Sequence, residues 1–237
     1  TIPYPPITPE NANQLEMVQV LSKGEPRDFV WSPDGTQLAI TAEGGTWIYD
    51  MTQEDMPSHW VKGHQFSPRI VYAPNHDIYI SFESVYDCEN SECPLGQKIF
   101  VRNLTTHEIL YEIGRAFSPF VKFSPDGNLL AIATYGGGIR IWETESFLTQ
   151  NPANPDDFML CQIPTIASPL DVTFSPDSSL ITYRGYSPFN ASPTDHSLWF
   201  WDTHTCELKI EIPVLITNQI LTFKFNAEFI AYSRDGQ

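Results

Sequence analysis

A short motif that recurs five times constrains the fold of this chain more than any other feature. Each copy places an aromatic residue before a turn, which in the clearest copies is Ser-Pro-Asp-Gly, and an apolar run after it. Successive aromatic residues are separated by 41, 51, 51 and 51 residues. Such a period is typical of repeat architectures, in which neighbouring units stack to share a core. The aromatic positions are Trp31, Tyr72, Phe123, Phe174 and Phe225.

Each repeat predicts four antiparallel strands. The aromatic residue ends an inner strand, and the turn follows because Pro sets φ while Asp and Gly tolerate a tight reversal. A second strand comes next, for instance Gln37–Thr41 or Leu129–Ala133. An aromatic third strand then ends at Asp50, Glu143 or Asp202. The fourth strands are expected at Trp60–Lys62, Ile109–Ile113, Met159–Ile163 and Leu208–Ile212.

Four-stranded sheets that repeat at this interval predict an all-β fold, a β-propeller whose blades pack around an axis. Residues 15–237 are expected to form it, with four full blades and a fifth that is partial. Leu15–Leu21 is expected to be the outer strand of the last blade. We expect an intact ring of six or seven blades, completed by further sequence or by another chain. Residues 1–14 are Pro-rich and are expected to form an extended linker.

The sequence resembles the Trp-Asp (WD) repeat family from about Leu15 onward. Ser197–Asp202, which reads SLWFWD and follows Asp195, matches the third strand of that family. Gly63 and His64 match its Gly-His signature. A second propeller family, typified by the Tol-system periplasmic protein, shares the turn but has a weaker third-strand Trp. The repeat positions that we expect to be structural are Trp31, His64, Phe123, Trp142, Phe174, Asp195 and Trp201.

The match to the WD family is partial at the third strands. Gly stands where the family has a turn Asp before the strands that end at Asp50 and Glu143, and the Gly-His pair occurs once. The resemblance therefore implies that the internal hydrogen-bond network of that family is absent from most blades.

Composition excludes several classes of protein. A hydrophobic content of 41% supports a packed core, and the longest apolar runs, such as Ile210–Ile216, are too short to span a bilayer. The net charge is −16, from 29 acidic and 13 basic residues. Nucleic acid is therefore not expected as a partner, because binding a polyanion needs a Lys/Arg face.

The cysteines indicate an oxidising compartment. Cys88 and Cys93 lie in a connection with few apolar residues, where a disulfide would order the loop. A zinc site there is disfavoured because the nearby Asp87, Glu89 and Glu92 are poor ligands for a structural zinc ion. Cys161 and Cys206 could be bridged or simply buried. We expect an extracellular, cell-surface or periplasmic location.

No catalytic motif is found. The sequence lacks Gly-x-Ser-x-Gly, His-Glu-x-x-His and a phosphate-binding Gly loop. The Gly-rich run Tyr135–Ile139 has no Lys and is interpreted as a hairpin turn. The six His residues are dispersed. We therefore expect no enzymatic activity, no cofactor and no metal.

The function is expected to lie in enlarged connections. Two connections between second and third strands, Ser84–Gln97 and Arg184–His196, open onto the face that the resemblance marks as the usual partner surface. A third, Glu145–Asp157, opens on the opposite face and is interpreted as a spacer. The candidate binding residues are Tyr86, Asp87, Arg184, Tyr186, Phe189 and His196.

The favoured hypothesis is a non-catalytic scaffold that binds proteins, among them other subunits of an assembly. The alternative is a ligand- or glycan-binding propeller domain accessory to an enzyme encoded elsewhere in the chain. The aromatic residues of the connections could also pack only within their own loops.

Overall fold

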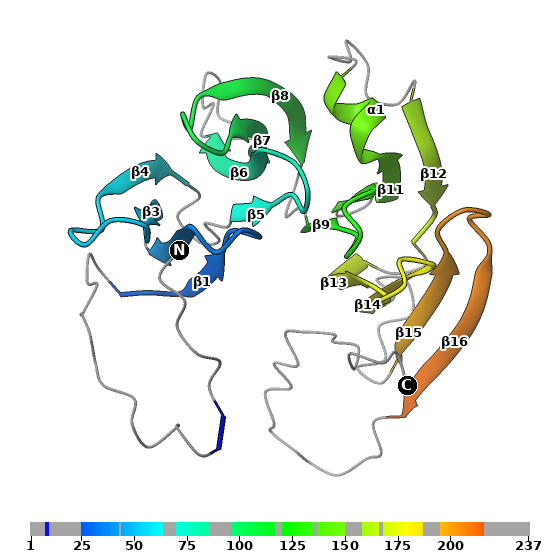
Figure 1. Cartoon of the computed structure of the whole chain (residues 1–237). Coiled ribbons are helices and arrows are strands. Elements are labelled where there is room, and N and C mark those ends of the chain that lie inside the picture. Colours follow the sequence, from blue (N-terminus) through cyan, green and yellow to red (C-terminus); the bar gives the residue numbers. More distant parts are fainter. Residues whose placement is uncertain are drawn as a thin grey trace, which may run out of the picture. The chain divides into compact units, whose positions relative to one another are not determined.

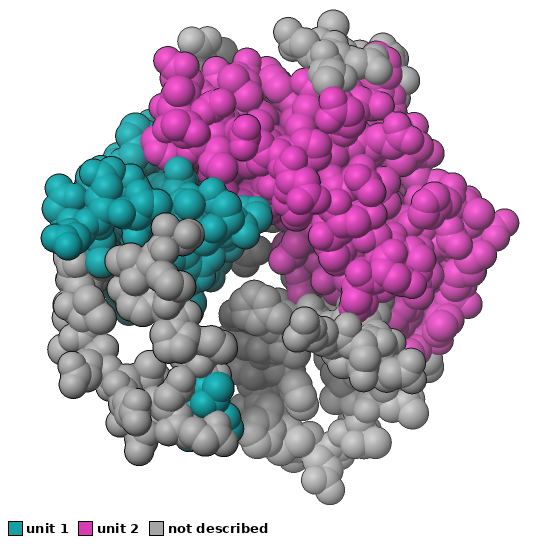
Figure 2. Space-filling model, in the orientation of Figure 1, with its two compact units in different colours: residues 1–70 teal, residues 71–237 magenta. Residues whose placement is uncertain are grey.

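The computed structural model is all-β, with four antiparallel sheets of four strands each in the part of the chain that it describes (Figure 1). The chain divides into two compact units, residues 1–70 and 71–237, which are coloured separately in Figure 2. The described residues are 8–9, 25–42, 44–63, 70–85, 96–116, 120–134, 137–149, 158–165, 168–186 and 195–215.

In every sheet the strands are neighbours in chain order, as expected for a blade made from one repeat. The first sheet, in the first unit, contains β1 (Asp28–Trp31), β2 (Gln37–Ala42), β3 (Gly45–Asp50) and β4 (Ser58–Lys62). The second contains β5 (Ile70–Tyr72), β6 (Ile78–Val85), β7 (Gly96–Asn103) and β8 (Ile109–Ala116). The third contains β9 (Phe120–Phe123), β10 (Leu129–Thr134), β11 (Gly138–Glu143) and β12 (Met159–Ile163). The fourth contains β13 (Ser168–Phe174), β14 (Leu180–Tyr186), β15 (Asp195–Asp202) and β16 (Leu208–Leu215).

The strand positions predicted from the repeat are confirmed in these four sheets. The inner strands end at Trp31, Tyr72, Phe123 and Phe174, and all four outer strands lie where they were expected. The predicted fifth inner strand at Phe225 and the outer strand at Leu15–Leu21 lie outside the described residues.

One element was not expected. The predicted spacer after the third strand of the third sheet begins with a short helix, α1 (Thr144–Thr149). Phe147 anchors it: this side chain is 1% exposed and lies 5.5 Å from the ring of Trp142 and 6.2 Å from that of Tyr111. The tyrosine hydroxyl also donates to the Phe147 carbonyl over 3.4 Å. Burial of this aromatic residue explains why a turn-rich segment starts as a helix.

The turn between the first two strands is held by its Ser and Asp. In the first sheet the Ser32 hydroxyl accepts the Gln37 N–H at 2.8 Å and donates to Asp34 at 2.6 Å. The same serine bond recurs at 2.9 Å from Leu129 to Ser124 and at 2.9 Å from Leu180 to Ser175. The hydrogen bonds that Asp34 accepts, that from Ser32 first and those from Thr36 next, lower its pKa below the ordinary value. The turn carboxylates therefore stay ionised and serve structure.

In the second unit, turns of neighbouring sheets touch. The Asn75 amide, in the β5–β6 turn, donates to the carbonyl of Asp126 in the β9–β10 turn over 3.1 Å. Gly127 beside it has φ +75°, and a Cβ there would stand 2.5 Å from the Pro74 carbonyl oxygen. Glycine is required at this position both by its conformation and by the close approach of the neighbouring turn.

Two cores join the three sheets of the second unit. The third sheet contributes to both, because alternate residues of β10 point to opposite faces. Leu129, Ala131 and Ala133 lie in the core shared with the fourth sheet, together with Trp199 and Trp201. Leu130 and Ile132 lie in the core shared with the second sheet, with Ile78, Ile80, Phe82, Ile99, Val101, Val121, Trp142 and Phe147.

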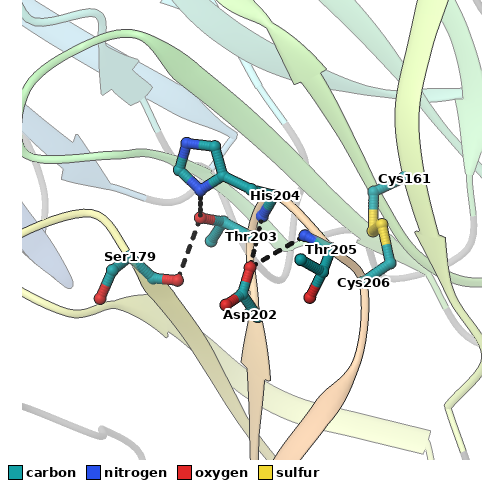
Figure 3. The surroundings of a disulfide bond; sticks show 7 residues. All are labelled: Cys161, Ser179, Asp202, Thr203, His204, Thr205 and Cys206. Atoms are coloured by element: carbon teal, nitrogen blue, oxygen red, sulfur yellow. Dashed lines mark hydrogen bonds between the residues drawn. A yellow bond between two sulfur atoms is a disulfide. The ribbon is translucent and has the colours of Figure 1, made fainter.

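A disulfide adds a covalent link between the third and fourth sheets. Cys161 on β12 and Cys206 just before β16, whose pairing was left open above, are bridged with their Cα atoms 5.9 Å apart (Figure 3). The turn that holds Cys206 is ordered by Asp202, whose carboxylate accepts the N–H groups of His204 and Thr205, each at 2.9 Å. Thr203 ties the turn back to the first turn of its own sheet by donating to the Ser178 carbonyl at 2.9 Å.

The outer strand of the second sheet makes the corresponding link without a disulfide. Tyr111 pairs with Val101 as Cys161 pairs with Ile141, so the two residues occupy the same place in their sheets. Tyr111 reaches Phe147 of the next sheet, and Cys161 reaches Cys206 of the next sheet. The same outer-strand position therefore fastens successive sheets by two different chemistries.

We predict that Gly127→Ala destabilises the protein by roughly 2 kcal/mol more than Gly35→Ala. Both glycines have positive φ, +75° and +71°, so both substitutions carry the backbone cost of about 1–2 kcal/mol. Only at Gly127 would the new methyl group meet a neighbouring backbone carbonyl, since nothing lies within 4 Å of a Cβ at Gly35. Urea unfolding of the two variants measures the difference, and equal losses would show that the turns do not pack as described.

We also predict that the double variant Cys161→Ser/Cys206→Ser unfolds about 4 kcal/mol more easily than the oxidised wild type. This figure is the loop-closure entropy for a bridge across 45 residues. Urea unfolding without reductant measures it. An unchanged midpoint in the double variant would show that the bridge does not stabilise the pairing of the two sheets.

Candidate interaction surface

The hairpins formed by the second and third strands differ in length between sheets. In the first and third sheets these strands are six residues each. In the second sheet both are eight residues, and in the fourth they are seven and eight. Those two sheets are the ones in which the sequence predicts enlarged connections. The longer strand pairs are therefore the ones that the enlarged connections join.

The structure moves the boundaries of the predicted connections. β6 and β7 pair without interruption through Ser84↔Gln97 and Val85↔Gly96, and β14 and β15 pair through Tyr186↔His196. The connections therefore comprise residues 86–95 and 187–194, shorter at both ends than predicted. The physical reason is that an unbroken antiparallel register continues to satisfy backbone hydrogen bonds beyond the point where the apolar pattern fades.

Of the predicted binding residues, three lie in strands. Arg184 and Tyr186 are in β14, and His196 is in β15 opposite Tyr186. Tyr86, Asp87 and Phe189 lie outside the described residues, as do His64 and both members of the predicted Cys88–Cys93 bridge. The register thus places the backbones of Tyr186 and His196 opposite each other at the end of the β14–β15 pair next to the connection.

Arg184 belongs to the body of the fourth sheet. It is half-buried, and its cross-strand neighbour on β13 is Asp171, which is 5% exposed. The Nε atom of Arg184 is buried and makes no hydrogen bond. Arg184 is therefore less accessible to a partner than an exposed loop residue would be.

The second sheet carries an ionic and aromatic face that sequence analysis did not single out. The Arg102 guanidinium pairs with Glu83 at 3.0 Å and Lys98 pairs with Glu112 at 3.0 Å. The Phe100 ring lies between the two cations, 5.8 Å from the Arg102 guanidinium carbon and 6.0 Å from the Lys98 ammonium. The signal was the alternation of charged and aromatic residues along β7, which puts all three on one face.

Arg102 is the centre of this face. Besides Glu83, it donates to the Ser81 hydroxyl at 2.9 Å and to the His107 carbonyl at 3.0 Å. Tyr79, fully buried on the same face, has its hydroxyl 3.3 Å from the His107 ring, and burial raises the pKa of this phenol. These contacts fasten β6, β7 and the following turn to each other. They stiffen the strand pair at the end away from residues 86–95, with the Arg102–Glu83 ion pair reaching toward the connection.

The repeat residues marked as structural differ in burial. Trp142, Phe174 and Trp201 are buried, with 2%, 5% and 8% of their surface exposed. Phe123 is half-buried, and Asp195 opens β15 opposite Leu215. Trp31, by contrast, is 49% exposed. The motif therefore places each aromatic residue correctly along its strand, while burial depends on what packs against that face.

The face of the first sheet that carries Trp31 is aromatic and partly exposed. Its register aligns Phe29, Ile40, Trp47 and Trp60 in one row across the four strands. The rings of Trp47 and Trp60 lie 4.7 Å apart, and Phe29 is 72% exposed. An exposed apolar row of this kind is typical of a surface that packs against another apolar surface.

Within the described residues, no cluster of three or more His, Cys, Asp or Glu side chains could hold a metal ion. No helix in those ranges has the length and apolar character needed to cross a bilayer. The carboxylates with lowered pKa, including Asp34, Asp177 and Asp202, accept hydrogen bonds within their own turns.

Comparison with known proteins places the chain by fold. No protein-family model and no curated protein sequence matches it. Among solved structures, a eukaryotic initiation factor aligns with a TM-score of 0.50 and 12% identity over 88% of this chain and 45% of its own. The β-propeller domain of Cps50 (Swd1) from Myceliophteria thermophila aligns with a TM-score of 0.45 and 13% identity over 78% of this chain and 72% of its own. The chain is thus similar in fold to that initiation-factor structure at low sequence identity, and its four-stranded antiparallel sheets match the blades of a β-propeller.

Proposed function

We propose that this protein is a non-catalytic scaffold that binds protein partners through the hairpin end of its second and fourth sheets. The observation that carries the proposal is the lengthening of β6–β7 and β14–β15 beneath the two enlarged connections. A binding loop that rises from a rigid strand pair loses less entropy on binding than one that is loose at its base. In the second sheet the Arg102 network fastens β6 to β7 from Tyr79 to Glu83, below the connection.

The residue types at this end suit protein recognition. Tyr86 and Asp87 belong to the first connection, and Phe189 to the second, with Tyr186 and His196 at its base. Aromatic side chains supply large contact areas at low entropic cost, and neighbouring charged groups add specificity. We assign these residues to the partner contact, with Arg184 in the strand pair below them.

The Cys161–Cys206 bridge supports an oxidising location. We propose that the protein works outside the cell, at its surface or in a periplasm, where a second bridge between Cys88 and Cys93 would order the first connection. We further propose that residues 15–237 form a WD-repeat propeller preceded by a Pro-rich linker, residues 1–14.

Replacing connections tests the proposed surface. One variant carries Gly-Ser linkers of equal length in place of residues 87–94 and 187–194. The matched control carries such a linker in place of residues 150–157, which follow α1 at the opposite end of the strands. Proteins of the native extracellular fraction are cross-linked to each variant and identified by mass spectrometry. We expect partners that wild type and control share to be lost from the first variant.

The outcome also separates the two functional classes. If the first variant retains every partner of the wild type, the proposed surface is wrong. An oligosaccharide array tested with the same three proteins addresses the alternative, a glycan-binding domain accessory to an enzyme. Glycan binding that is lost only from the first variant, without any protein partner, would favour that alternative.

A further inference from the structure

The turn between β7 and β8 is capped by an asparagine. The side-chain oxygen of Asn103 accepts the N–H groups of Thr105 at 2.9 Å and Thr106 at 2.8 Å. The Asn103 N–H donates to the Glu108 carbonyl at 3.0 Å, and its carbonyl accepts the His107 N–H at 3.1 Å. Because both donors meet one side-chain atom, they identify that atom as the oxygen, and the other atom is the amide nitrogen Nδ2.

The same place in the first and fourth sheets, the last residue of the third strand, is taken by an aspartate. Asp50 accepts the Thr52 N–H at 2.9 Å, and Asp202 accepts two N–H groups of its own turn. The cap needs an oxygen that accepts hydrogen bonds, which aspartate and asparagine both provide. Asn103 therefore adds one group to the cap, Nδ2, that the turn does not use.

Solvent reaches the Nδ2 atom of Asn103. Within the described residues this nitrogen makes no hydrogen bond, and the buried polar atoms there that lack a partner belong to other residues. Asn103 is half-buried, while Thr105 and Thr106 beside it are exposed. The turn lies at the end of β7 opposite residues 86–95. The free amide is therefore on the surface and away from the proposed partner contact.

The sequence of this turn is an acceptor pattern for a glycan. Asn103, Leu104 and Thr105 read Asn-x-Thr, with a middle residue other than proline. This pattern marks asparagine-linked glycosylation in surface turns of secreted proteins. Within the described residues the Thr105 hydroxyl makes no hydrogen bond, so the turn does not require it. A second match, Asn190-Ala191-Ser192, lies outside the described residues.

The residues after the turn offer a surface for a glycan to cover. Ile109 pairs with Arg102, the neighbour of Asn103 in the chain, and is 48% exposed. Leu110, which follows it, is 50% exposed. A glycan is bulky and solubilising, so one attached at Asn103 would shield this apolar pair from water.

We propose that Asn103 is a site of asparagine-linked glycosylation. A bond forms between Nδ2 and the anomeric carbon of an oligosaccharide carried on a lipid pyrophosphate. The bond from that carbon to the pyrophosphate oxygen breaks, the lipid pyrophosphate leaves, and Nδ2 loses a proton. The side-chain oxygen keeps its place as the cap of the turn. The assignment rests on the proposed location outside the cell, at its surface or in a periplasm, and does not involve the partner surface.

The test compares the wild type with three variants of the full chain, each purified from the native extracellular or periplasmic fraction. Asn103→Asp keeps the cap, as Asp202 does in its own turn, and removes the acceptor nitrogen. Thr105→Ala breaks the acceptor pattern, and the matched control Thr105→Ser preserves it. Glycopeptide mass spectrometry reads residue 103. We expect a glycan there in the wild type and in Thr105→Ser, and its complete loss from the other two variants.

The state of the Cys161–Cys206 bridge in the same samples separates this inference from the proposed location. An unmodified Asn103 in wild-type protein whose bridge is formed would overturn the inference alone, and an unmodified Asn103 with free thiols would overturn both. Equal glycan content in the wild type and Asn103→Asp would also overturn the inference, because the acceptor would be another residue. If Asn103→Asp does not fold, Thr105→Ala is read instead, since it keeps the backbone hydrogen bonds of the turn.

Discussion

Burial of the third sheet on both faces is the constraint on which the rest of the second unit depends. β10 alternates between two cores, with Leu130 at 0% exposure on one side and Ala131 at 1% on the other. Burying one large aliphatic side chain contributes about 1.5–3 kcal/mol, so the two cores outweigh any single polar contact. Ala131 and Ala133 on β10 lie in the same core as the large rings of Trp199 and Trp201. Each sheet is therefore stable because its neighbours are present.

The contacts that fasten successive sheets differ in chemistry. Asn75 donates to Asp126 between turns, Tyr111 reaches Phe147, and Cys161 is bonded to Cys206. These contacts lie on turns and outer strands at the end opposite the enlarged hairpins, or along the sheets between the ends. The hairpin end is thereby left free to vary in length and residue type without disturbing the cores. Loops that vary on a rigid framework are a common way for a fold to acquire binding specificity.

The sequence predicted the strands well and the burial less well. The regular interval located Trp31, Phe123 and Phe174 at strand ends because a turn residue and an aromatic residue mark both sides of that boundary. It could not show that Trp31 is half exposed, since exposure depends on a neighbouring sheet. The helix at Thr144–Thr149 depends on burial of Phe147 by residues of two other strands, and the pairing of Cys161 with Cys206 depends on the approach of two sheets. Of the candidate site, Arg184, Tyr186 and His196 were placed in loops because the predicted strands stopped where the apolar pattern stopped.

Native-state hydrogen exchange tests the central claim, that the sheets of the second unit are stable only together. Amides of β10 and β14 are followed at increasing concentrations of urea. Because these strands share a core, we predict that they exchange through one common opening, with the same free energy and the same dependence on urea. If β10 and β14 instead open with separate free energies and separate urea dependences, the sheets fold independently and the account is contradicted.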